Sequence, residues 1–107
     1  MKSKEKRWKT GDLRVWWIPQ IPMTPFIVPV SSPTEGRKIL DVLAEYDRFQ
    51  FEKKVKPDYS NTGGLSVFDE SDKTDSPRGS WSDWYDDDGD DIDAYEFNSN
   101  GLLVKTE

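Results

Sequence analysis

The sequence predicts an α+β fold, in which a small antiparallel sheet of about four strands carries one main helix on one face and the termini are flexible. Three observations lead to this prediction. The chain has 107 residues, which is room for one domain. One long segment has helical periodicity and a clear N-terminal cap. Two short segments typical of strands lie on each side of it. A helix packed on one face of a sheet buries the apolar sides of both.

The predicted helix spans residues 33–52. It begins with Ser32-Pro33-Thr34-Glu35, a capping box in which the Ser32 hydroxyl accepts from the Glu35 N–H and the Glu35 carboxylate reaches back. The apolar residues that follow at helical spacing are Ile39, Val42, Leu43 and Tyr46. Pro57 sets the latest point at which the helix can end.

Segments rich in β-branched and aromatic residues predict strands over residues 13–18, 26–28, 65–68 and 81–85. Five prolines between residues 19 and 33 place the second strand at an edge of the sheet, because proline cannot donate to a strand ladder. Trp81 and Trp84 are three residues apart in the fourth strand, so they are expected on opposite faces unless a bulge intervenes.

The remaining segments are predicted to be connections, a short helix and the two chain termini. Gly63-Gly64 closes a turn-forming stretch, residues 69–80 form a long hairpin loop, and residues 91–97 form a short helix capped by Asp90 or Asp91. The predicted organisation is a flexible basic arm over residues 1–10, a single α+β domain over 11–97 and a flexible tail over 98–107.

The composition argues against several classes of protein. Cys and His are absent, which removes disulfides and the common ligands of zinc and iron. No apolar run approaches the ~20 residues of a membrane span, and no signal-peptide core follows the basic N-terminus. No nucleophile-elbow or P-loop motif is present. We therefore expect a protein that is not an enzyme, with no cofactor, no metal and no membrane association.

The charge is strongly polarised along the chain. The formal net charge is -6, but residues 1–14 contain six cations and two acids, whereas residues 69–97 contain twelve acids and two cations. Such asymmetry favours a partner chosen by electrostatics. A pair of solvated, charged ends is the plainer alternative.

The acidic segment also contains large aromatic side chains. Residues 83–96 contain eight acids and no base. Spaced carboxylates can imitate the phosphates of a nucleic-acid duplex, and aromatic side chains can anchor an interface. The predicted partner-binding residues are Trp81, Asp83, Trp84, Tyr85, Asp86, Asp87, Asp88, Asp90, Asp91 and Asp93. The alternatives are a solvated acidic turn and aromatic residues that belong to the core, and the exposure of the two tryptophans discriminates between them.

The acidic residues 86–93 do not fit the pattern of a calcium-binding EF-hand loop. With Gly89 at position 6 of an EF-hand loop, Trp84 falls on position 1 and Tyr95 on position 12, where carboxylate ligands are needed. The first and the closing ligands are therefore both missing.

Two further hypotheses remain open. A small nucleotide signal could be sequestered by Arg14, Trp16, Trp17 and Arg48, with an indole stacked on the base and an arginine on the phosphate. A minor virion or structural role is also compatible with the composition. The net charge of -6 argues against direct nucleic-acid binding by the basic arm. The oligomeric state is not predicted.

Four segments taken together carry a resemblance to known proteins: residues 17–23 (WIPQIPM), 46–52 (YDRFQFE), 56–65 (KPDYSNTGGL) and 81–89 (WSDWYDDDG). The set resembles small acidic accessory proteins encoded by bacteriophages and prophages, over residues 14–95. The resemblance implies a phage accessory protein in the host bacterial cytoplasm, and such proteins commonly act as stoichiometric binders of host machinery. It supplies no functional residues.

Together with the acidic segment, this resemblance leads to the main functional prediction. The chain is expected to bind and inhibit a host nucleic-acid-handling or defence protein, in the manner of an anti-CRISPR protein or a DNA mimic. The expected partner has a basic, nucleic-acid-binding groove.

Overall fold

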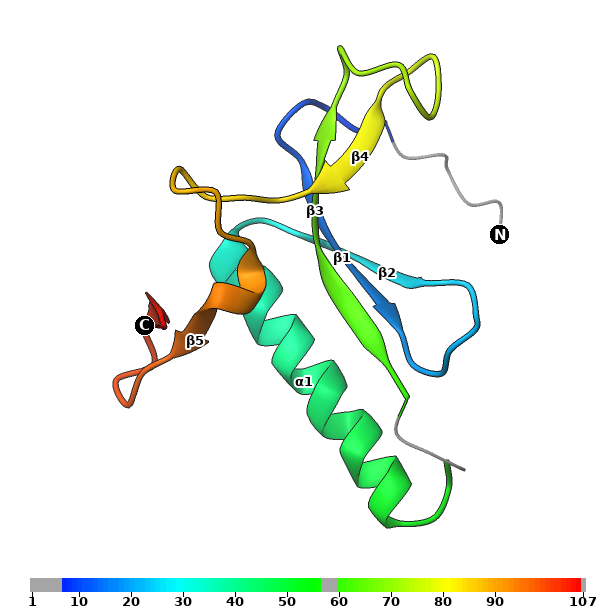
Figure 1. The fold of residues 1–107 in the computed structure, drawn as a ribbon, viewed down its shortest axis with the longest axis vertical. Helices are drawn as coiled ribbons and strands as arrows, with labels where there is room; N and C mark the ends of the chain where they lie inside the picture. Colours follow the sequence, from blue (N-terminus) through cyan, green and yellow to red (C-terminus); the bar gives the residue numbers. More distant parts are fainter. Residues whose placement is uncertain (1–6, 57–59, 107) are drawn as a thin grey trace.

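The fold is a four-stranded antiparallel sheet with one long helix on one face and a small hairpin beside the helix (Figure 1). This computed structural model describes residues 7–56 and 60–106. The elements in chain order are β1 (Leu13–Ile18), β2 (Phe26–Val30), α1 (Pro33–Glu52), β3 (Thr62–Asp69), β4 (Ser80–Asp83), the single 3-10 turn η1 (Ile92–Ala94), β5 (Tyr95–Phe97) and β6 (Leu103–Lys105). The predicted α+β class is confirmed. The strand order is β2-β1-β3-β4, so β2 lies at an edge, as its prolines predicted.

The helix has the bounds that its capping sequence predicted. The Ser32 hydroxyl accepts from the Glu35 N–H at 3.1 Å. The Glu35 carboxylate accepts from the backbone N–H of Ser31 at 2.7 Å, one residue before the cap. Both bonds satisfy donors that would otherwise have no partner at the helix start. α1 is therefore fixed at its N-terminus by local sequence alone.

The core lies between α1 and the face of the sheet that it covers. Val15 and Trp17 of β1, Leu65 of β3 and Leu40 of α1 are buried there, and Ile92 of η1 joins them. Because side chains alternate along a strand, Arg14 and Trp16 point to the opposite face. The C-terminal turns of α1 project past the ends of β1 and β2 (Figure 1), so Phe49 remains 54% exposed.

Gly63 and Gly64 lie inside β3, so the prediction that they form a turn is wrong. They pair with Trp17 and Trp16 of β1. A Cβ on Gly63 would lie 2.3 Å from the Trp17 ring, and one on Gly64 would lie 2.9 Å from the Trp16 indole nitrogen. The two glycines are needed because the indoles of β1 lie across the backbone of β3.

A second aromatic cluster lies on the face of the sheet away from α1. Phe68 of β3 is opposite Trp81 of β4, with ring centroids 5.1 Å apart. Trp8 meets the Trp81 ring edge-on at 4.8 Å, and the Arg14 guanidinium lies 4.1 Å from the centroid of that ring. The described part of the N-terminal arm is thus packed on the sheet, while residues 1–6 lie outside the described residues.

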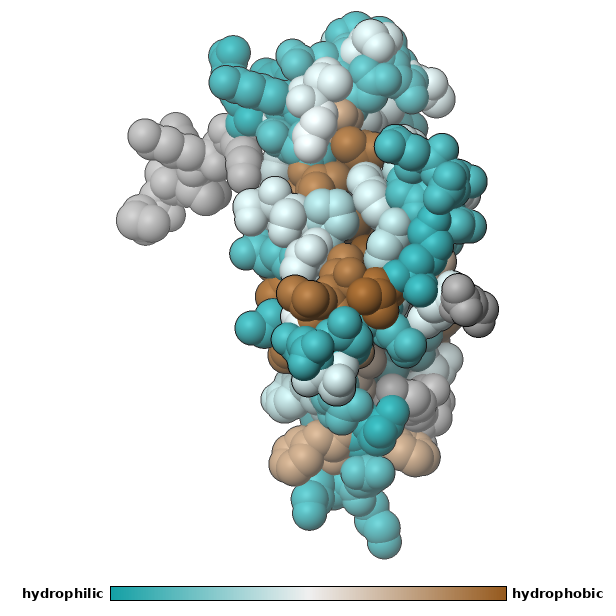
Figure 2. Space-filling model, turned by 90° about the vertical axis from the view of Figure 1, so that its left-hand side faces the viewer, coloured by the Kyte–Doolittle hydropathy of each residue, from teal (hydrophilic) through white to brown (hydrophobic). Residues whose placement is uncertain are grey.

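The C-terminal region differs from the prediction of a short helix and a flexible tail. Asp91 caps only the 3-10 turn η1, after which Tyr95–Phe97 pair with Leu103–Lys105. Gly101, at a φ of 78°, closes the connecting turn. Figure 2 views the molecule from the side of this hairpin and shows an apolar patch near mid-height. Leu102, in the hairpin, is 62% exposed. The helical prediction failed because the strand pairing depends on residues that follow position 97.

Candidate functional site: an acidic loop held by Lys105

Residues 86–90 of the acidic segment fold into a tight loop, called the acidic loop, which is centred on Asp86. The Asp86 N–H donates to the Asp90 carbonyl at 2.8 Å, and one carboxylate oxygen of Asp86 accepts from the N–H groups of Asp88 and Asp90 at 2.9 and 3.0 Å. Gly89 takes a φ of 85°, a conformation that glycine adopts without strain. The loop is therefore ordered by its own first aspartate.

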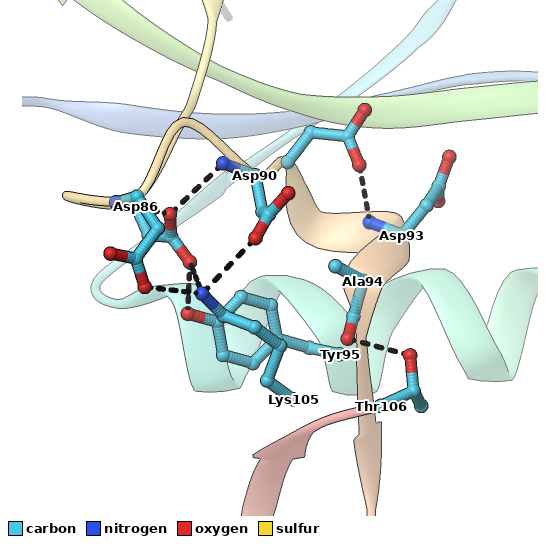
Figure 3. A network of polar contacts seen from close by, with 9 residues as sticks. Asp86, Asp90, Asp93, Ala94, Tyr95, Lys105 and Thr106 are labelled. Atoms are coloured by element: carbon cyan, nitrogen blue, oxygen red, sulfur yellow. Dashed lines mark hydrogen bonds and ion pairs between the residues drawn. The ribbon is translucent and has the colours of Figure 1, made fainter.

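A lysine from β6 occupies the centre of this loop (Figure 3). The Lys105 ammonium lies 2.8 Å from a carboxylate oxygen of Asp86, 2.8 Å from one of Asp88 and 3.2 Å from one of Asp90. The Tyr95 hydroxyl donates to the same Asp86 oxygen at 2.6 Å. Lys105, a residue of the predicted flexible tail, thus holds the acidic loop together with Tyr95. Three carboxylates surround one ammonium, so the cluster remains negative.

The electrostatics of this cluster favour its charged form. The Lys105 ammonium, followed by the Tyr95 hydroxyl, holds the pKa of Asp86 well below its usual range. The Asp86 and Asp88 carboxylates raise the pKa of Lys105, and Asp86 raises the pKa of Tyr95. At neutral pH Asp86 is therefore ionised, Lys105 is protonated and Tyr95 is a neutral donor.

A second group of acids gathers where β4 and η1 approach each other. Asp83 of β4 and Asp91 and Asp93 at η1 line a hollow of about 190 Å³, together with Trp16 and the backbone of Gly63 and Gly64. The side chain of Asp93 is 77% exposed and lies 3.6 Å from the Arg37 guanidinium. The Arg37 guanidinium also donates to the Ile92 carbonyl at 3.3 Å. This contact ties η1 to α1 and holds the acids of η1 near that of β4.

The predicted partner-binding residues do not all share one surface. The aspartates and Tyr85 lie around the loop and the hollow, and Tyr85 is 55% exposed among them. Trp84 is half-buried against the core beside Tyr95. Trp81 belongs to the aromatic cluster on the far face with Phe68. The two tryptophans are therefore on opposite faces, and neither is fully buried or fully exposed.

The four residues of the alternative nucleotide site are not brought together. Arg14 and Trp16 lie on the face away from α1. Trp17 lies on the covered face, is only 6% exposed and donates its indole N–H to Asp47 at 3.0 Å. Arg48 lies on α1, 3.6 Å from Glu45. Burial of Trp17 in the core removes one of the two indoles proposed to stack on a base, whereas Trp16 is only partly buried.

The sequence did not single out a buried polar network around Asp47. This carboxylate accepts from the Trp17 indole and lies 3.1 Å from the Lys56 ammonium, which also donates to the Pro19 carbonyl. Asp47 is only 3% exposed. Its position on the apolar helix face, four residues after Leu43, is the signal that could have revealed it. The network joins α1 to β1 and serves the fold.

Within residues 7–56 and 60–106, no cluster of three or more acidic side chains is placed to hold a metal ion. Where the carboxylates of Asp86, Asp88 and Asp90 converge, the Lys105 ammonium takes the central position. In the same part of the chain, no helix combines the length and apolar composition needed to cross a membrane.

Comparison with known proteins gives two matches. The family model described as superinfection exclusion gene product 17 matches residues 12–100. A protein of Salmonella phage P22, described as a superinfection exclusion protein, is 53% identical over 78 residues, an alignment that covers 68% of this chain and 76% of the relative. No solved structure matches. The range matched by the family model contains the whole four-stranded sheet, α1 and the acidic loop, and ends before Lys105.

Proposed function

This chain belongs to the superinfection exclusion gene product 17 family of phage accessory proteins, and on that premise we propose that it acts by stoichiometric binding through its acidic face. The acidic face consists of Asp83, Tyr85, Asp87, Asp88, Asp90, Asp91 and Asp93. The proposed partner is a protein with a basic, nucleic-acid-binding groove in the cytoplasm of the infected bacterium. Binding would block that groove and so prevent productive infection by a second phage.

One observation carries this proposal: the acidic loop is ordered rather than loose. A loose acidic segment loses conformational entropy when it binds, whereas a preordered one does not. The ion pairs of Lys105 hold the backbone of residues 86–90 in place while the Asp88 side chain remains 79% exposed. Asp87 is also exposed, next to the exposed Tyr85. Fixed carboxylates beside an aromatic anchor suit a basic groove.

The charge of the surface sets the expected character of binding. Carboxylates that replace phosphates in a basic groove attract the partner over long range, and salt screens this attraction. Retention of the partner should therefore fall steeply as the salt concentration rises. Competition with duplex nucleic acid follows from the same reasoning, since both ligands would occupy one groove.

An infection assay with matched variants tests the proposal. Host cells that express the full chain are challenged with a second phage, and plaques are counted. Asp83→Asn and Asp87→Asn together remove two exposed charges without touching Asp86 or the Asp91 cap. We expect this double variant to weaken binding of the partner at least about tenfold, which corresponds to ~1.4 kcal/mol, and so to restore plating of the second phage.

The control changes two exposed acids elsewhere by the same chemistry. Glu45→Gln and Glu52→Gln lie on α1, away from the acidic face, and this variant should exclude the second phage as the wild type does. If the Asp83→Asn/Asp87→Asn variant is folded and still excludes the second phage fully, the acidic face is not the binding surface. Tagged wild-type and variant chains are also compared by co-purification from the same cells at low and high salt.

A further inference from the structure

A hollow lies on the opposite side of the sheet from α1. It has a volume of about 690 Å³ and is enclosed by the N-terminal segment, the end of β3 and the loop that joins β3 to β4. Ligand pockets typically measure ~300–1,000 Å³, so this volume is sufficient for a small molecule. The acids of the acidic face do not line it.

Aromatic side chains form the floor of this pocket. Trp8, Phe68 and Trp81 all line it, and their rings pack on one another at centroid distances of 4.8 and 5.1 Å. Gly79 completes the wall at a φ of 139°, where a Cβ would lie 2.5 Å from the Phe68 ring. The loop can therefore approach Phe68 only with glycine at this position. The result is an apolar pocket floor suited to contact with a flat ring.

The wall that carries Trp8 is held in place by three hydrogen bonds donated by backbone N–H groups. The N–H of Thr10 donates to the Glu70 carboxylate at 2.9 Å, and the N–H of Glu70 donates to the Thr10 hydroxyl at 2.9 Å. The Gly11 N–H donates to the Phe68 carbonyl at 2.9 Å. These bonds join the N-terminal segment to β3 and to the loop after it. The pocket is thus formed before any ligand arrives.

The residues that line the pocket carry a net positive charge, whereas the chain as a whole is negative. Arg7, Lys9 and Arg78 line it, against the acids Glu70 and Asp75. The Glu70 carboxylate already accepts from Thr10. The chain as a whole has a net charge of -6, but here three cations lie beside the aromatic floor of the pocket. They form a local site for an anionic ring compound.

We propose that this pocket binds a nucleotide unit, with the base against Trp8 and the phosphate against Arg78, Arg7 and Lys9. Arginine suits the phosphate because its planar guanidinium makes paired hydrogen bonds to phosphate oxygens. Aromatic stacking suits any base, because every base has a π-face. The same chemistry is offered by a free nucleotide and by a residue of a single strand. The site is independent of the acidic face and does not rest on the proposed function.

Calorimetric titration of the full chain tests this site. The probes are adenosine monophosphate, guanosine monophosphate, adenosine, inorganic phosphate and a short oligothymidylate. We expect at least one mononucleotide to bind with a Kd below about 1 mM, and adenosine and phosphate alone to bind at least tenfold more weakly. Tighter binding of the oligothymidylate would assign the nucleotide unit to a single strand, and weaker binding would assign it to a free nucleotide.

Variants separate the pocket from general charge effects. Arg78→Glu and Trp8→Ala should each weaken binding at least tenfold, while Trp8→Phe keeps most of it. Lys38→Glu makes the same charge change on exposed α1 and should bind as the wild type does. If Arg78→Glu is poorly folded by circular dichroism, Lys9→Glu replaces it.

Two results would overturn the proposal. One is the absence of binding for every nucleotide probe at millimolar concentration. The other is unchanged binding in folded Arg78→Glu or Lys9→Glu together with Trp8→Ala. The Asp83→Asn/Asp87→Asn variant should bind nucleotide normally, so failure of the acidic-face proposal and failure of this one are distinguishable.

Discussion

Replacement of Asp47 by Ala is expected to lower the free energy of unfolding by about 3–5 kcal/mol, the usual cost of removing one partner from a buried ion pair. The Asp47 carboxylate is 3% exposed and serves two donors, the Trp17 indole at 3.0 Å and the Lys56 ammonium at 3.1 Å. Its removal leaves both donors in a protein interior. A domain of this size has a stability of roughly 5–15 kcal/mol, so this single change removes a large part of it.

Graded substitutions at the same position apportion that loss. Asp47→Asn retains an oxygen for the Trp17 indole and loses the charge that faces Lys56, so it should cost about 1.5–3 kcal/mol. Lys56→Met removes the ammonium, whose side chain is 11% exposed. It keeps the hydrogen bond from Trp17 but leaves the buried Asp47 carboxylate without a cation, so it should cost about 3–5 kcal/mol, at least as much as Asp47→Asn.

Urea unfolding followed by tryptophan fluorescence measures these differences. The midpoint should shift while the m-value stays constant, since the surface exposed on unfolding is unchanged. Glu45→Ala, an exposed acid on the same helix, should stay within about 0.5 kcal/mol of the wild type. A loss below ~1 kcal/mol for Asp47→Ala would refute the argument, because the pair would then not be desolvated.

Three other changes test the local arguments. Gly63→Ala should cost about 1–3 kcal/mol or more, because the new Cβ would lie 2.3 Å from the Trp17 ring; chemical denaturation checks this, and a neutral result would mean that the indole moves freely. Ser32→Ala should cost about 1 kcal/mol and Ser32→Gly only a few tenths, measured as the difference in unfolding free energy; unchanged stability in Ser32→Ala would contradict the capping bond. Lys105→Met should destabilise the chain at neutral pH. The lowered pKa of Asp86 contributes stability above its unfolded value of ~3.9, and this contribution is lost as the pH falls through the folded value. The stability difference between wild type and Lys105→Met should therefore begin to shrink below about pH 4 and continue to shrink as the pH falls toward the lowered pKa of Asp86, and a difference that stays constant over this range would exclude the Asp86 linkage.

Local chemistry made much of the fold predictable. The bounds of α1 follow from the Ser32 cap and the apolar spacing, and the edge position of β2 follows from its prolines. The long loop between β3 and β4 agrees with its polar composition. These features depend on residues close together in the chain, so the local sequence is sufficient to predict them.

The errors share a different cause. Gly63-Gly64 is typical of a turn, and only the indoles of a strand 46 and 48 positions earlier require glycine inside β3. Residues 95–97 have no helical or strand preference strong enough to decide their state without β6. Trp17, one of two tryptophans considered for stacking on a nucleotide base in the alternative site, is a core residue bonded to Asp47, which only the tertiary structure reveals.

The sequence by itself determined that this is a small acidic α+β chain with its negative charge concentrated after residue 69, because composition and charge order do not depend on folding. The tertiary structure alone decided what that charge does. It placed Lys105 among three of the aspartates, left others exposed beside Tyr85, and gathered Trp8, Trp81 and Arg78 around a separate pocket. Such groupings join residues far apart in the chain, and their ion pairs and packing depend on distances that only the folded chain supplies.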